Sequence, residues 1–184
     1  VQITGLQAEP NATYATSYIP NHGTSGGVTR AADKGQKASI SSLFGATATS
    51  FFLDFEKEEN AIGWTFTGNT GTKLFSVCQF DASNSQRPRV VFDDGVDTST
   101  TLTPLSVGRH KLAVSYSEND TRIYIDGTLV FTDTSSTYYQ YDRLGVNATS
   151  WSGYTNNVLS ANINKFLMFP TALTNAELAT LTTL

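Results

Sequence analysis

The stretch of sequence that decides the fold runs from residue 109 to residue 133 and reads RHKLAVSYSENDTRIYIDGTLVFTD. Its first nine residues alternate, so that Leu112, Val114 and Tyr116 fall on one face of an extended strand. The pair Asp126-Gly127 has the composition of a two-residue hairpin turn, which tolerates positive φ. Strands flank this pair, and a polar loop at 117–120 joins them to the first strand. The stretch therefore predicts an antiparallel three-strand meander.

Outward from the meander, β-rich runs separated by turn residues fill most of the chain. These runs are residues 50–58, 73–80, 87–93, 98–103 and 162–169. In the first run, Phe51, Leu53 and Phe55 alternate and are expected to point inward. The apolar second half of the last run suits a central strand. Cys78 and Trp64 lie in strand-like runs and are expected to be buried.

One helix is predicted, at the end of the chain. Thr174 and Glu177 have the spacing of a capping box, in which each side chain satisfies a free backbone N–H of the first turn. Leu178, Leu181 and Leu184 follow at a spacing of three and predict an apolar helical face. The fold class is therefore all-β, an antiparallel β-sandwich with one short C-terminal helix.

Composition narrows the function classes. Charged residues make up 15% of the 184 residues and the net charge is −4, so no basic field attracts nucleic acid. No apolar run approaches the roughly 20 residues of a membrane span, so we expect no membrane insertion. A single cysteine, Cys78, excludes an internal disulfide. Residues 1–35 carry Pro and Gly without periodicity and are expected to form an extended leader from an upstream domain; residues 36–184 form one domain.

Three segments carry a family resemblance. They are RHKLAVSY at 109–116, TRIYIDGTLV at 121–130 and INKFLMFPTALTNAEL at 163–178. In this order they resemble the laminin-G-like branch of the concanavalin A-like lectin/glucanase superfamily. The resemblance implies a jelly-roll sandwich, a fold that hosts lectins, adhesion modules and hydrolases.

The leader carries a second resemblance. Gln7-Ala8-Glu9, ATSYIP at 15–20 and VTRAAD at 28–33 are similar to a segment of tailed-bacteriophage tail-fibre proteins. This resemblance implies a receptor-binding protein on the virion surface, extracellular, within a homotrimeric fibre. Its partner would be a host surface glycan or another envelope component.

Aromatic residues supply the candidate ligand-binding site. The group comprises Tyr138, Tyr139, Tyr141, Trp151, Tyr154 and Asn156. Aromatic rings stack on sugar faces and amides bond sugar hydroxyls, so this composition suits a glycan platform. The same residues equally fit an aromatic cluster packed on the sandwich or at a subunit contact.

Acidic residues offer two further interpretations. Asp54, Glu56 and Glu58 alternate along one strand. The resemblance implies a comparison with the glucanases of that superfamily, which place catalytic carboxylates on alternate strand positions, but the strict motif is absent and a solvated outer face explains the three residues better. Asp93, Asp94 and Asp97 share a loop that can hold structural Ca²⁺, or that is an ordinary Asp-Gly turn. Asp126 is interpreted as turn chemistry alone.

We expect no catalytic residue and no other cofactor. His22 and His110 have no acid or nucleophile at a readable spacing. The leading hypothesis is a non-catalytic carbohydrate- or receptor-binding module. The alternatives are a glycan depolymerase fragment and a structural decoration or trimerisation module.

Overall fold

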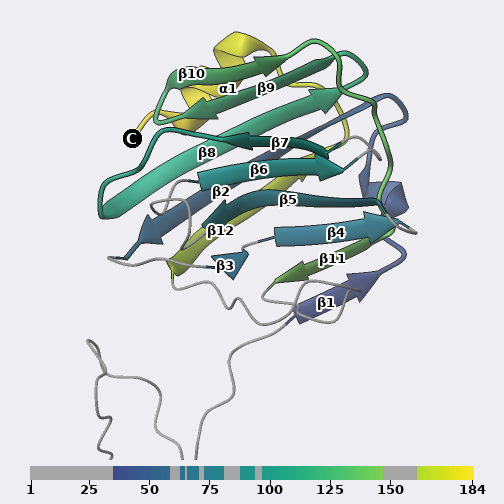
Figure 1. Ribbon diagram of the computed structural model, residues 1–184, viewed down its shortest axis with the longest axis horizontal. Helices are drawn as coiled ribbons and strands as arrows, with labels where there is room; N and C mark the ends of the chain where they lie inside the picture. Colours follow the sequence, from purple (N-terminus) through teal and green to yellow (C-terminus); the bar gives the residue numbers. More distant parts are fainter. Residues whose placement is uncertain are drawn as a thin grey trace, which may run out of the picture. The chain divides into compact units, whose positions relative to one another are not determined.

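The computed structural model describes residues 35–58, 63–64, 66–70, 73–80, 88–93, 97–146 and 161–184. All of them belong to the second of the chain's two units, Lys34–Leu184. Within this unit, strands form two antiparallel sheets (Figure 1). The all-β fold with one short C-terminal helix is confirmed.

The five-stranded sheet contains the meander. Its strand order is β10-β9-β8-β2-β12. The bounds are β2 Ala48–Lys57, β8 Gly108–Ser117, β9 Asp120–Ile125, β10 Thr128–Asp133 and β12 Ala161–Phe169. Asp126 and Gly127 join β9 to β10 with φ of 48° and 80°, so both turn positions take the left-handed conformation that the sequence predicts.

The second sheet has the order β1-β11-β4-β5-β6-β7, with β3 paired to β5. Its strands are β1 Gly35–Ala38, β3 Gly63–Trp64, β4 Phe66–Thr70, β5 Lys73–Phe80, β6 Pro88–Asp93, β7 Asp97–Thr101 and β11 Arg143–Val146. A short 3-10 helix, Ser41–Leu43, follows β1.

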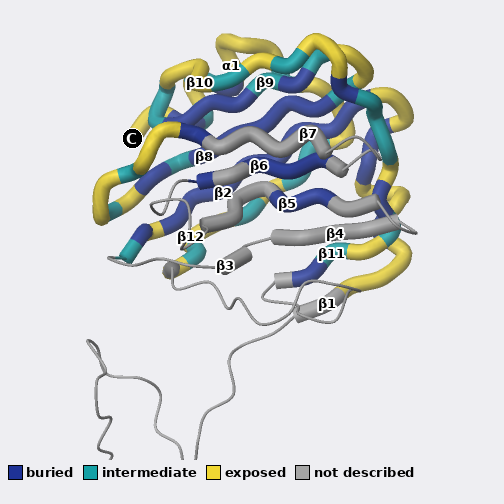
Figure 2. Tube along the Cα trace, viewed as in Figure 1, coloured by how far each residue is buried: buried dark blue, intermediate teal, exposed yellow. Residues whose placement is uncertain are grey.

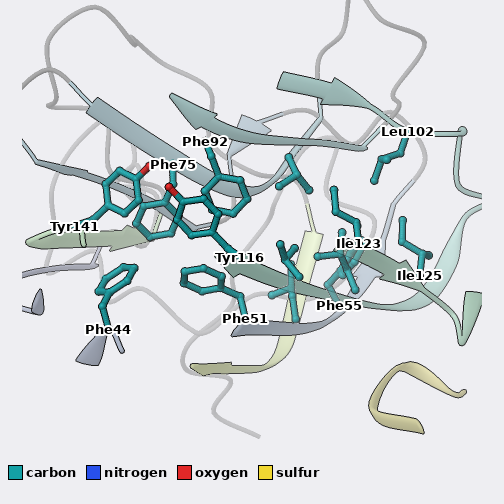
Figure 3. Packing of buried hydrophobic residues seen from close by; sticks show 14 of the residues in the cluster. Phe44, Phe51, Phe55, Phe75, Phe92, Leu102, Tyr116, Ile123, Ile125 and Tyr141 are labelled. Carbon is teal, nitrogen blue, oxygen red and sulfur yellow. The ribbon is translucent and has the colours of Figure 1, made fainter. Parts of the chain in front are cut away.

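The core lies between the two sheets and is rich in aromatic rings (Figure 3). Phe51 on β2 stacks on Phe75 of β5 with 5.3 Å between the ring centroids. Phe92 on β6 stacks on Tyr116 of β8 at 4.1 Å. Phe51, Leu53 and Phe55 all point inward and are buried, as the alternation predicts. Stacked rings therefore join the two sheets.

The helix α1, Asn175–Thr182, covers the outer face of the five-stranded sheet beside β8, β9 and β10. Its capping box is present: Thr174 accepts from the amide of Glu177, and the Glu177 carboxylate accepts from the amide of Thr174. Leu178 is buried against Phe52, Ala113 and Tyr124. This second apolar layer explains why β2 is buried on both of its faces (Figure 2).

Two expectations are corrected. The strand β12 is an edge strand, not a central one; its apolar half contacts the main core through Phe166 and Met168 and the helix layer through Phe169. Leu184 lies beyond the end of α1 and is 65% exposed, so it does not extend the apolar helical face. Apart from Gly35, the predicted leader lies outside the described residues, as does His22. The structure places Cys78 and Trp64 in strands and does not describe their side chains.

Candidate functional site

A group of charged side chains lies on the outer face of the five-stranded sheet, the face turned away from the main core. These side chains come from β2, β8 and β12. Strand register sets Lys111, Asp54 and Lys165 side by side across β8, β2 and β12. The adjacent row on the same face holds Arg109, Glu56 and Asn162. We call these six residues the charged face. It combines three cations with two carboxylates in a chain whose net charge is −4.

Asp54 and Arg109 form the central contact of the charged face. Arg109 Nε donates to Asp54 Oδ1 at 3.0 Å, and Nη2 donates to Oδ2 at 2.6 Å. The Asp54 side chain is 7% exposed, whereas that of Arg109 is 58% exposed. A buried carboxylate therefore fixes an accessible guanidinium in one orientation.

An irregularity in β12 completes this contact. The register of β12 against β2 shifts between Ile163 and Lys165, so Asn164 falls at a bulge. From there the Asn164 amide donates to Asp54 Oδ1 at 3.2 Å. Asp54 thus accepts three hydrogen bonds, which satisfies a carboxylate that has lost most of its water.

The solvated-face interpretation of Asp54, Glu56 and Glu58 is therefore wrong for Asp54. Glu56 is exposed and Glu58 is half-buried. Hydrogen bonding by Arg109 holds the pKa of Asp54 below its usual range against the opposing effect of burial. The same contact raises the pKa of Arg109. A carboxyl group kept ionised in this way suits the anchoring of a cation better than donation of a proton.

A second polar cluster ties the hairpin turn to β8. His110 Nδ1 lies 2.6 Å from Asp126 Oδ2, and its Nε2 lies 2.9 Å from the carbonyl of Ser106. Asp126 Oδ1 accepts from the backbone amide of Lys111 at 2.9 Å. Asp126 therefore does more than turn chemistry. His110 is hydrogen-bonded through both of its ring nitrogens, and its acidic partner lies 16 residues further along the chain.

The aromatic candidates divide into two groups. Tyr141 is a core residue in tilted contact with Phe44 and Phe75, so it belongs to the packed cluster and not to a surface platform. Tyr138 is half-buried against Tyr116; its hydroxyl contacts Thr49 and donates to the carbonyl of Gly45. Burial raises the pKa of Tyr138.

Of the remaining candidates, Tyr139 packs half-buried against the core. Trp151, Tyr154 and Asn156 lie outside the described residues. Where the structure describes this aromatic group, it is packed on the sandwich.

The proposed calcium loop is described only in part. Asp93 and Asp97 pair where β6 ends and β7 begins; their side chains are not described, and Asp94 lies outside the described residues. Among the described residues, no three His, Cys, Asp or Glu side chains gather as a metal site. No helix in the described part of the chain is long and apolar enough to cross a membrane.

An open apolar groove of about 400 Å³ runs between α1 and the end of β12. Its walls are Phe169, Leu173, Ala176, Glu177, Thr180 and Leu181. The polar groups among them are already used: Glu177 binds Thr174, and the Thr180 hydroxyl donates to the carbonyl of Ala176. The groove therefore offers apolar contact without directional partners.

No protein-family model and no curated protein matches this chain. Solved structures do match. The carbohydrate-binding module CBM40 of the Ruminococcus gnavus IT-sialidase superposes with a TM-score of 0.62 at 15% identity, over 80% of this chain and 98% of the module. The fold is similar to that of a sialidase-associated lectin module. A second structure of that module holds α2,6-sialyllactose.

Longer sialidases contain the same fold. The NanB sialidase of Streptococcus pneumoniae matches with a TM-score of 0.60 at 15% identity, over 80% of this chain and 27% of NanB. The leech intramolecular trans-sialidase matches with a TM-score of 0.57 at 18% identity, over 75% of this chain and 23% of that enzyme. This chain thus spans about a quarter of each enzyme. At such identities the likeness establishes the lectin-like β-sandwich; the laminin-G-like, phage-associated branch stays a prediction.

The charged face is not evident from the sequence. Arg109, Lys111, Asn164 and Lys165 lie in the predicted strands 109–117 and 162–169, where nothing marks them as site residues. One signal in the sequence was available: Arg109 and Lys111 occupy alternate positions of one predicted strand, so they share a face. Asp54 and Glu56 do the same on another predicted strand. Only the strand order makes them neighbours.

Proposed function

We propose that this chain is a non-catalytic glycan-binding module. The observation that carries the proposal is the match to a complete carbohydrate-binding module, because the shared fold spans 98% of that module and only about a quarter of the sialidases. The charged face adds an accessible polar surface, and its buried carboxylate serves to hold Arg109. Binding, rather than bond cleavage, fits these features best.

A glycan array tests the proposal directly. The full chain is applied to sialylated, neutral and bacterial surface glycans, and hits are followed by calorimetry with sialyllactose and with lactose. Binding to at least one glycan class without sugar release is the expected result. Absence of binding to every glycan overturns the proposal, and sugar release that Glu56→Gln abolishes favours the depolymerase alternative.

The leader supports a finer proposal about context. From its resemblance to tail-fibre segments, we propose that the module is displayed on a virion surface as part of a homotrimer, where weak sites gain strength by multivalency. Light scattering on the full chain gives the oligomeric state, and adsorption of the chain to host cells gives the partner. A monomer that adsorbs to no bacterial surface contradicts this context and leaves the fold-based proposal standing.

A further inference from the structure

The accessible atoms of Arg109 define what the charged face can bind. Asp54 occupies the Nε and Nη2 side of the guanidinium. Among the described residues, no acceptor contacts Nη1, and more than half of the Arg109 side chain is exposed. A guanidinium whose orientation is already fixed loses little conformational entropy when it binds an oxyanion.

Lys165 supplies a second accessible cation. It is exposed, lies directly across from Asp54, and has no ionic partner among the described residues. The backbones of Lys165 and Arg109 are about 12 Å apart, because they are separated by two strand spacings across the sheet and by two residues along the strands. Two side chains of this length can contact one ligand across that distance. Lys111 is partly used, because its Nζ donates to the carbonyl of Thr183 at 2.5 Å.

Glu56 and Asn162 are the polar, non-cationic residues of the charged face that can bind the hydroxyl groups of a ligand. They sit in the same row as Arg109 and are exposed. A carboxylate and an amide accept and donate hydrogen bonds to hydroxyl groups, and a neighbouring carboxylate weakens the binding of a bare anion. The face therefore favours a ligand that carries both an anionic group and hydroxyls over a simple anion.

We propose that the charged face binds an anionic sugar, with its acid group on Arg109 and Lys165 and its hydroxyls on Glu56 and Asn162. This inference rests on the proposed glycan-binding function. Asp54 and Asn164 act as positioning residues: Asp54 is buried and holds the Arg109 guanidinium, and the Asn164 amide donates to the Asp54 carboxylate.

Calorimetry with four probes tests the inference: sialyllactose, sulfated lactose, lactose and sodium acetate. The wild-type chain is expected to bind at least one acidic sugar about tenfold more tightly than lactose, because a hydrogen bond to a charged group contributes about that much. Acetate alone is expected to bind far more weakly. The preference for the acidic sugar shrinks as salt rises, because exposed charges are screened.

Substitutions distinguish a loss of binding at the charged face from a general loss of folding. Arg109→Gln is expected to remove the preference for the acidic sugar over lactose. Arg143→Gln, an equally exposed arginine on the opposite sheet, is the matched control and keeps the preference. Arg109→Lys keeps the positive charge but loses the two-pronged guanidinium contact with Asp54, so a partial loss of the preference for the acidic sugar is expected. Asp54→Asn reports positioning, through a weaker acidic preference in a chain whose thermal transition stays cooperative.

The outcomes distinguish the two proposals. If lactose and acidic sugars bind equally, or if Arg109→Gln behaves as Arg143→Gln does, the anionic-sugar site is wrong while glycan binding stands. If acetate binds as tightly as the acidic sugars, the face is a simple anion site and the inference fails. If no probe and no array glycan binds, both proposals fail.

Discussion

His110 and Asp126 are held together at 2.6 Å across the start of β8 and the β9–β10 turn. The contact matters because Asp126 is also a left-handed turn residue, and the amide of the next residue, Gly127, donates to the hydroxyl of Thr182 in α1. One turn thus joins the strand, the hairpin and the helix.

We predict that Asp126→Gly lowers the free energy of unfolding by about 2 kcal/mol, because two hydrogen-bonded groups lose their acceptor. Glycine tolerates the left-handed turn, so the loss reports the carboxylate and not backbone strain. Urea denaturation measures the effect. Unchanged stability would show that Asp126 performs turn chemistry alone, as its sequence context suggests.

Tyr116 provides a second test, inside the core. Its buried hydroxyl donates to the carbonyl of Thr137 at 2.5 Å and accepts from the amide of Tyr139 at 2.9 Å. Tyr116→Phe is expected to destabilise the fold by about 1–3 kcal/mol, because it leaves two partly buried backbone groups without this partner. Tyr124→Phe is the matched control, since no described residue bonds the Tyr124 hydroxyl, and it should be nearly neutral. Equal effects would contradict the role assigned to Tyr116.

The helix cap predicts a smaller change. Thr174→Ala removes the acceptor for the Glu177 amide and should cost about 1 kcal/mol. Thr180→Ala alters an exposed position within the same helix and should be neutral or slightly stabilising. Thermal unfolding of both variants checks the difference, and a cap variant as stable as Thr180→Ala refutes it.

Acid should weaken the fold through Asp54. Its pKa lies below the ordinary value of 3.8, so the folded state favours the ionised form. The stabilisation is present above that ordinary value and is lost as the pH falls through the folded pKa. Urea midpoints measured between pH 7 and pH 2.5 should therefore fall in acid. The fall should be shallower in Asp54→Asn; identical profiles would exclude Asp54 as a contributor. Glu177 contributes in the same direction, because hydrogen bonds from Thr174 lower its pKa.

Local patterns were sufficient for the meander, its turn and the helix cap. Alternation in residues 109–117, the Asp126-Gly127 pair and the Thr174–Glu177 spacing each act over a few residues, so the strand, turn and cap are encoded where they form. The same reasoning failed for β12, because an apolar run indicates burial on two faces and not the position of a strand within its sheet. A C-terminal helix that covers the sheet produces the same pattern.

The sequence by itself determined the strands of the five-stranded sheet, the hairpin, the helix cap and the inward residues of β2, but not β1, β4 or β11 of the second sheet. Tertiary structure alone decided that Tyr141 enters the core, that Asp54 is buried beneath Arg109 and that Lys111, Asp54 and Lys165 form one row. Lys111 and Lys165 are 54 positions apart along the chain, and Asp54 and Lys165 are 111 positions apart. The order of the strands in the sheet brings all three together. Side-chain periodicity is a property of neighbouring residues, whereas a site assembled across strands depends on which strands pair and in which register.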